Sequence, residues 1–180
     1  MIVCKLNEDL LRSTSCGYSL PEIVEIYLAN YEDLTKTPEI SASEDGEDEV
    51  TAITLANSAK FLKIEPAKNS ASFEDTLVVE DNGTKYRTAS VTFNVSGTYT
   101  KKLHAALDAL SLGRYFVVVK TADGNYLGLG RISPLEAETA TLAGGSDSNG
   151  MTIVLIGNIA ESPMTLSEAA VKTVLGITGN

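Results

Sequence analysis

Few residues in this chain have side chains suited to catalysis or metal binding. His104, in KKLHAAL, is the only histidine among 180 residues, and nothing in the sequence marks a serine or cysteine nucleophile that it could activate. Cys4 and Cys16 are the only cysteines, and their spacing does not form half of a zinc site. We expect two unreacted thiols, with a disulfide as the alternative, and we expect no catalytic residue, metal or cofactor.

Two glycine- or acid-rich motifs resemble known ligand loops only in part. GLGR at 128–131 is half of a dinucleotide fingerprint, lacks the third glycine and lies within a predicted strand. It predicts a close backbone approach or a bulge in a sheet. SEDGEDEV and GSDSNG lack the twelve-residue alternation of oxygen ligands that ends in glutamate in a calcium loop.

The negative charge is concentrated near the start of the chain. The net charge is −10, and residues 1–50 contain 12 acids and 3 bases. Binding of nucleic acid by phosphate neutralisation needs a basic face, so this balance disfavours it. The balance is still compatible with an acidic surface that repels a polyanion.

Two polar loops are therefore the candidate functional segments. The first is an acidic loop at about 37–49, and the second spans about 143–150. We expect the first either to be a solvated loop or to face a confined space or a neighbouring subunit, and the second to be a solvated loop. The candidate residues are Glu44, Asp45, Glu47, Asp48, Glu49, Ser146, Asp147 and Asn149.

Alternating apolar and polar residues around short turns predict three hairpins. In FEDTLVVEDNGTKYRTASVTFNV, Asn82-Gly83 supplies the turn, and 86–95 alternates between an apolar and a hydroxyl-rich face. RYFVVVKT-ADGN-YLGLGRIS and LEAETATL-AGGSDSNG-MTIVLIGNI predict two more. Both faces of the last strand, MTIVLIGNI, are apolar, so we expect it to lie centrally or to meet a partner. Strands are also expected in PEIVEIYLAN and in VTAITLANSAKFLKIEPA.

One amphipathic helix is predicted after the first hairpin. Leu103, Leu107 and Leu110 share one helical face, and Gly113 ends the segment. A short helix could start after Ser167 as N-cap, in a C-terminal arm over about 163–180. The chain is thus expected to be one domain, 1–180, mainly β: an antiparallel β-sandwich or barrel with one flanking α-helix. No apolar run is long enough for a membrane helix, and the start lacks a secretory pattern, so we expect folding in the cytosol.

Several of these segments resemble structural proteins of tailed bacteriophages of gut Bacteroidales-type hosts. The likeness runs from about Cys16 to Pro163 and rests on CGYSLPEIVEIYLANYEDL, on KFLKIEPAKNSASFEDTLVVEDNGTKYRTASVTFNV and on the two later hairpins. The predicted architecture is similar to that of the tail tube (major tail) protein family. The resemblance implies stacked homo-hexameric rings, in which sheets of neighbouring subunits join into an inner barrel and long loops bridge successive rings.

The resemblance implies a non-enzymatic virion protein of the tail, assembled in the host cytoplasm. Its partners would be copies of itself and other tail proteins, with double-stranded DNA as transient cargo during ejection and no membrane. A related ring, such as a tail terminator, neck or baseplate-hub adaptor, is one alternative. A β-sandwich adhesin or carbohydrate-binding module is another, which the absence of tryptophan disfavours.

Overall fold

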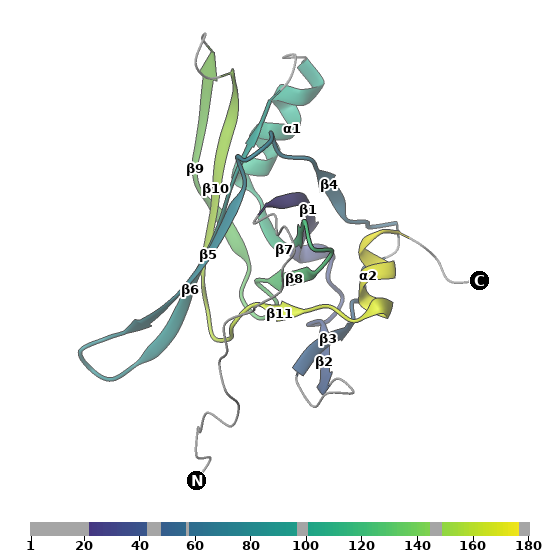
Figure 1. Ribbon diagram of the computed structural model, residues 1–180, viewed down its shortest axis with the longest axis vertical. Coiled ribbons are helices and arrows are strands. Elements are labelled where there is room, and N and C mark those ends of the chain that lie inside the picture. The colour runs from purple at the N-terminus through teal and green to yellow at the C-terminus, as the bar shows by residue number, and fades with distance from the viewer. Residues whose placement is uncertain (1–21, 43–47, 57, 97–100, 145–148, 177–180) are drawn as a thin grey trace, which may run out of the picture.

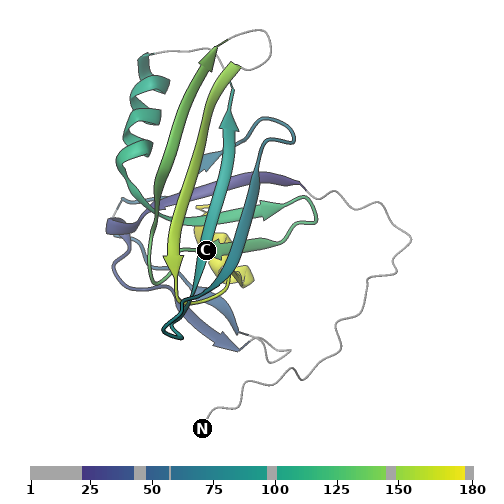
Figure 2. The same ribbon diagram turned by 90° about the vertical axis from the view of Figure 1, so that its left-hand side faces the viewer.

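Antiparallel hairpins build most of the molecule. The computed structural model describes residues 22–42, 48–56, 58–96, 101–144 and 149–176. Strands β9, β10, β6 and β5 form one layer, and β4, β1, β7, β8 and β11 form a second layer that crosses behind it (Figures 1 and 2). A short pairing of β7 with β9, at Arg114↔Glu136 and Tyr115↔Leu135, joins the two layers at a corner. The predicted fold class, mainly β with antiparallel sandwich-like packing, is confirmed.

Two of the predicted hairpins make the first layer. β5 (Ser72–Val79) and β6 (Lys85–Val95) are joined by the Asn82-Gly83 turn, where Gly83 has φ 84°. β9 (Leu135–Gly144) and β10 (Asn149–Ile159) form the second hairpin, and β10 pairs with β6. β10 therefore lies centrally in its layer, as predicted. The β5–β6 hairpin projects beyond the sandwich (Figure 1).

The second layer contains the strands with the most apolar sequences. Its members are β1 (Ile23–Asn30), β4 (Leu62–Ile64), β7 (Arg114–Thr121), β8 (Tyr126–Leu129) and β11 (Met164–Thr165). β7 alternates between two cores: Val117 and Val119 face the first layer, and Phe116 and Val118 face the opposite side. A strand buried on both faces explains the unbroken run FVVV.

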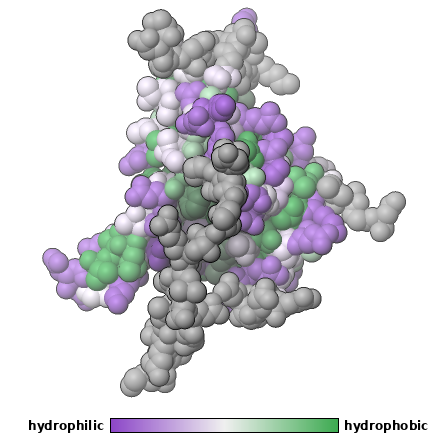
Figure 3. Space-filling view, in the orientation of Figure 1, coloured by the Kyte–Doolittle hydropathy of each residue, from purple (hydrophilic) through white to green (hydrophobic). Residues whose placement is uncertain are grey.

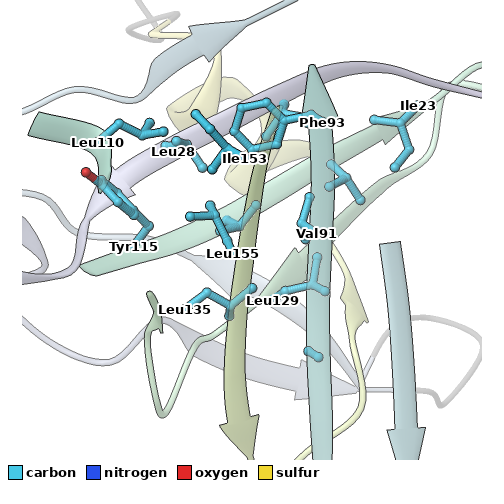
Figure 4. Close-up of a cluster of buried hydrophobic side chains, with 14 of the residues drawn as sticks. Ile23, Leu28, Val91, Phe93, Leu110, Tyr115, Leu129, Leu135, Ile153 and Leu155 are labelled. Carbon is cyan, nitrogen blue, oxygen red and sulfur yellow. The ribbon is translucent and has the colours of Figure 1, made fainter. Parts of the chain in front are cut away.

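The main core lies between the layers. Phe93 and Val91 of β6 and Ile153 and Leu155 of β10 meet Leu28 and Leu129 of the second layer (Figure 4). Helix α1 (Lys101–Leu112) closes one end through Leu107 and Leu110. This confirms the predicted helix and its apolar stripe at those two leucines. Neither helix in the described ranges is long and apolar enough to cross a membrane.

A smaller core covers the far side of the second layer. Helix α2 (Glu168–Val174) buries Ala170 and Val174 there, and the Ser167 hydroxyl accepts a hydrogen bond of 3.3 Å from the Ala170 amide. The prediction of a helix capped by Ser167 is confirmed. From Met164 to Val174, however, the predicted C-terminal arm is part of the packed body, because β11 pairs with β8 and α2 is half embedded.

The prediction of a loop at about 37–49 is wrong at 39–42 and 48–49, which are strand, and residues 43–47 lie outside the described residues. β2 (Glu39–Ala42) and β3 (Asp48–Ala52) form a two-stranded antiparallel sheet. Val50 is buried in the smaller core and bridges to Leu166, so this residue anchors the hairpin to the body of the molecule. A short 3-10 helix, η1 (Tyr31–Asp33), links β1 to this region.

The glycines of GLGR serve packing, as predicted. A Cβ on Gly128 would lie 3.1 Å from the Phe116 ring, and a Cβ on Gly130 would lie 2.6 Å from Leu135 Cδ1. Gly130 also has φ +82°, which an L side chain rarely adopts.

Candidate functional site

The first layer has one face that no described helix or strand covers (Figure 2). The strand registers define this "hydroxyl face", because its residues alternate with the buried Ala89, Val91, Phe93, Ile153 and Leu155. Half of the residues on it are serine or threonine, and none is fully buried. It comprises Ser72, Glu74, Thr76, Val78, Tyr86, Thr88, Ser90, Thr92, Asn94, Glu136, Thr139, Thr141, Thr152, Val154, Ile156 and Asn158.

Charge on the hydroxyl face is sparse and of one sign. Glu74 and Glu136 are its acids, and it has no lysine or arginine. The nearest bases in β6, Lys85 and Arg87, alternate onto the opposite side of the sheet. A polyanion near this face would find hydroxyl groups and weak repulsion but no cation to bind.

Neighbouring strands hold the polar side chains of this face in place. Asn94 Nδ2 donates to Thr152 Oγ1 at 3.0 Å, and Thr88 Oγ1 donates to Asn158 Oδ1 at 3.0 Å. Tyr86 donates to Glu80 at 2.8 Å, and this hydrogen bond raises the pKa of Tyr86. The hydroxyl face is therefore polar, and hydrogen bonds between neighbouring strands fix the orientation of its side chains.

Among the described residues, neither edge of this layer is fully paired to a further strand, although α1 packs beside β9 (Figure 2). β5 pairs only with β6, and β9 pairs with β10 along its length but with β7 only at Leu135 and Glu136. Open edges of this length are aggregation sites unless a partner covers them.

Apolar side chains are exposed along these edges, on the side opposite the hydroxyl face. Leu77 and Val79 of β5 are 53% and 56% exposed, and Leu142 of β9 is 53% exposed. The apolar surface of the projecting hairpin is visible in Figure 3. Apolar surface beside an unpaired strand is typical of a protein interface.

An ion pair stiffens the base of the projecting hairpin. Arg87 Nε donates to Asp75 Oδ2 at 2.7 Å, and this contact raises the pKa of Arg87. The Asp75 side chain is only 9% exposed. The β5–β6 hairpin is therefore fixed at its base by this ion pair, and its projecting end exposes apolar side chains.

A second charged cluster crosses β4, β1 and β7. Glu25 accepts from Lys63 at 2.6 Å, Lys120 at 2.9 Å and the Tyr27 hydroxyl at 2.8 Å. Burial opposes ionisation of Glu25, but these donors outweigh it and lower its pKa to about 2. Burial and the bond to Glu25 raise the pKa of Tyr27 to about 12. Cross-strand pairing of these fixed charges stabilises the sheet.

Of the predicted loop residues, those that the structure describes do not gather on the hydroxyl face. Asp48 and Glu49 lie in β3, beside α2 and on the far side of the second layer (Figure 1). Asn149 begins β10, opposite Gly144. Glu44, Asp45, Glu47, Ser146 and Asp147 lie outside the described residues. Within the described ranges, no group of three or more His, Cys, Asp or Glu side chains could hold a metal ion, and His104 lies exposed on α1.

Only one strand of the hydroxyl face was predicted from the sequence. The alternation in β6 was recognised, but its continuation through Thr139 and Thr141 or through Ser72 and Thr76 was not. The alternation of ETATL in β9 was the available signal. No protein-family model, curated protein or solved structure matches this chain. The sheet face and its edges are therefore the features that bear on function.

Proposed function

We propose that this chain is a structural subunit of a phage tail tube, which assembles into rings whose inner wall conducts double-stranded DNA. The hydroxyl face carries the proposal. It is a broad ordered sheet surface that is polar, weakly acidic and free of lysine and arginine. Such a surface suits a channel through which a polyanion slides without binding.

The open edges of β5 and β9 support assembly through sheet pairing. Each copy offers two different edges, so contact between copies is head-to-tail and generates a ring if the rotation closes. Four strands per copy lie in the layer, and barrels of about 16–18 strands already enclose an aqueous channel. Four or more copies would therefore surround an open bore, in keeping with the hexamer that the family resemblance implies.

Electron microscopy of the concentrated protein tests this function. We expect rings or tubes by negative stain and a concentration-dependent mass by light scattering. Leu77→Lys places a charge on the exposed edge of β5 and should abolish assembly while the circular dichroism spectrum stays unchanged.

Leu175→Lys is the matched control, because Leu175 is also exposed, at 41%, but follows α2 far from both edges. It should assemble normally. A wild-type protein that stays monomeric at high concentration would contradict the proposed function.

A further inference from the structure

We propose that the outer edge of β5 pairs antiparallel with the outer edge of β9 in a second copy, with Thr76 opposite Thr141. This inference rests on the proposed function, which requires the four-stranded layers of successive copies to be continuous. It names the two strands that meet and their register.

Strand direction makes β5 and β9 compatible. β9, β10, β6 and β5 alternate in direction across the layer. β5 and β9 are therefore antiparallel, and placing β9 of the next copy beside β5 continues the alternation around a ring. Pairing β5 with β5 would instead give a two-fold dimer that leaves both β9 edges open.

Matching of faces limits the register to steps of two residues. Thr76 and Thr141 both lie on the hydroxyl face, whereas Leu77 and Ala140 lie on the opposite side of the sheet. With Thr76 opposite Thr141, the hydroxyl face runs unbroken from copy to copy. A slip of one residue in the register would place Leu77 in line with the hydroxyl face of the next copy.

The stagger of the two edges selects among the remaining registers. Thr141 of β9 pairs with Thr152 of β10, which in turn pairs with Asn94 of β6. Thr76 of β5 pairs with Thr88 of β6, six residues before Asn94. At about 3.4 Å per residue this stagger is about 20 Å, across a layer about 19 Å wide for four strands. If all copies in a ring lie at the same height along its axis, this stagger requires the strands to tilt by about 45° from that axis. Closed barrels have tilts of about 35–45°.

The register with Thr76 opposite Thr139 is the nearest competitor. It would place Leu77 beside the bulge of β9, between Ala137 and Thr139, and Val79 opposite Glu136, which already pairs with β7. In the proposed register only Val79 lies beside the bulge. The proposed register instead places Leu77 opposite Ala140 and next to Leu142, so that these exposed side chains cover each other. Burial of these apolar groups favours it.

Cysteine cross-linking of the full chain tests the register. In a background with Cys4→Ser and Cys16→Ser, the Thr76→Cys/Thr141→Cys variant should form a ladder of covalent oligomers on mild oxidation. A mixture of the two single variants should give dimers only. Thr76, Thr141 and Thr139 are exposed, so these changes should preserve folding.

The matched control is Thr76→Cys/Thr139→Cys, which should cross-link roughly ten-fold less because its Cβ atoms are too far apart. A stronger ladder from this control overturns the register, and dimers from Thr76→Cys alone overturn the choice of β9. Rings by microscopy without any cross-link overturn this inference and leave the proposed function standing. Absence of both rings and cross-links overturns both.

Discussion

Arg131 and Glu161 form a two-pronged ion pair that ties the end of β8 to the end of β10. Arg131 Nε lies 2.9 Å from Glu161 Oε1, and Arg131 Nη2 lies 2.5 Å from Oε2. The same guanidinium donates from Nη1 to the Pro38 carbonyl at 3.0 Å. One side chain thus connects both layers to the start of the acidic β2–β3 hairpin.

We expect Glu161→Gln to loosen this junction. The two side chains are 13% and 14% exposed, so loss of one charge leaves the other poorly solvated. The free energy of unfolding in urea should fall by about 2 kcal/mol, and hydrogen exchange should rise in β2. Glu168→Gln, in the solvent-exposed pair with Lys172, is the control and should change neither measurement. Equal effects of the two changes would contradict the role of the Arg131 junction.

Glu25 should make the fold sensitive to acid. Its folded-state pKa of about 2 lies below the ordinary value of 4.5. Its stabilisation is therefore fully present above about pH 4.5 and is lost as the pH falls towards 2. Glu25→Gln should cost about 1–2 kcal/mol at pH 7 and should flatten the stability profile between pH 4.5 and 2. Glu65→Gln, which changes only the exposed partner of Lys63, should leave the acid limb unchanged.

The α2 cap offers a test of how the C-terminal segment is held. Ser167→Ala removes the acceptor of the Ala170 amide and should lower the free energy of unfolding by about 1 kcal/mol. Ser167→Asp, which retains an acceptor at the N-cap, should restore most of it. Thermal unfolding followed by circular dichroism measures both, and wild-type stability of Ser167→Ala would show that the cap is unimportant.

A lysine on the hydroxyl face should allow this surface to bind DNA. Thr139→Lys adds a cation at an exposed site of β9, repeated in every copy of a ring. Assembled particles of this variant should retain double-stranded DNA in low salt and release it as salt rises, whereas wild-type particles should not retain it.

Thr173→Lys adds the same charge on α2, on the far side of the second layer. It should retain markedly less DNA than Thr139→Lys. Equal retention by the two variants would indicate general attraction to the particle surface and would contradict a channel lined by the hydroxyl face.

Local sequence predicted the hairpins and helices well. The Asn82-Gly83 turn, the stripe of Leu107 and Leu110 and the Ser167 cap each depend on residues a few positions apart, and the structure has each as predicted. Strand was expected in VTAITLANSAKFLKIEPA, which contains the end of β3, but β2 and its pairing with β3 escaped prediction because acidic residues surround them. The strand structure of this hairpin depends on Val50 reaching a core formed by distant segments, including Phe116 and Ala170.

The sequence by itself determined which residues of each strand share a face, because side chains alternate along an extended chain. Only the tertiary structure decided which strands lie side by side. It brought the threonines of β5, β6, β9 and β10 onto one uncovered surface, placed Asp48 and Glu49 on the other side of the molecule, and left the edges of β5 and β9 open. The physical reason is that strand order depends on burying apolar faces against residues far away in the chain, which no local pattern encodes.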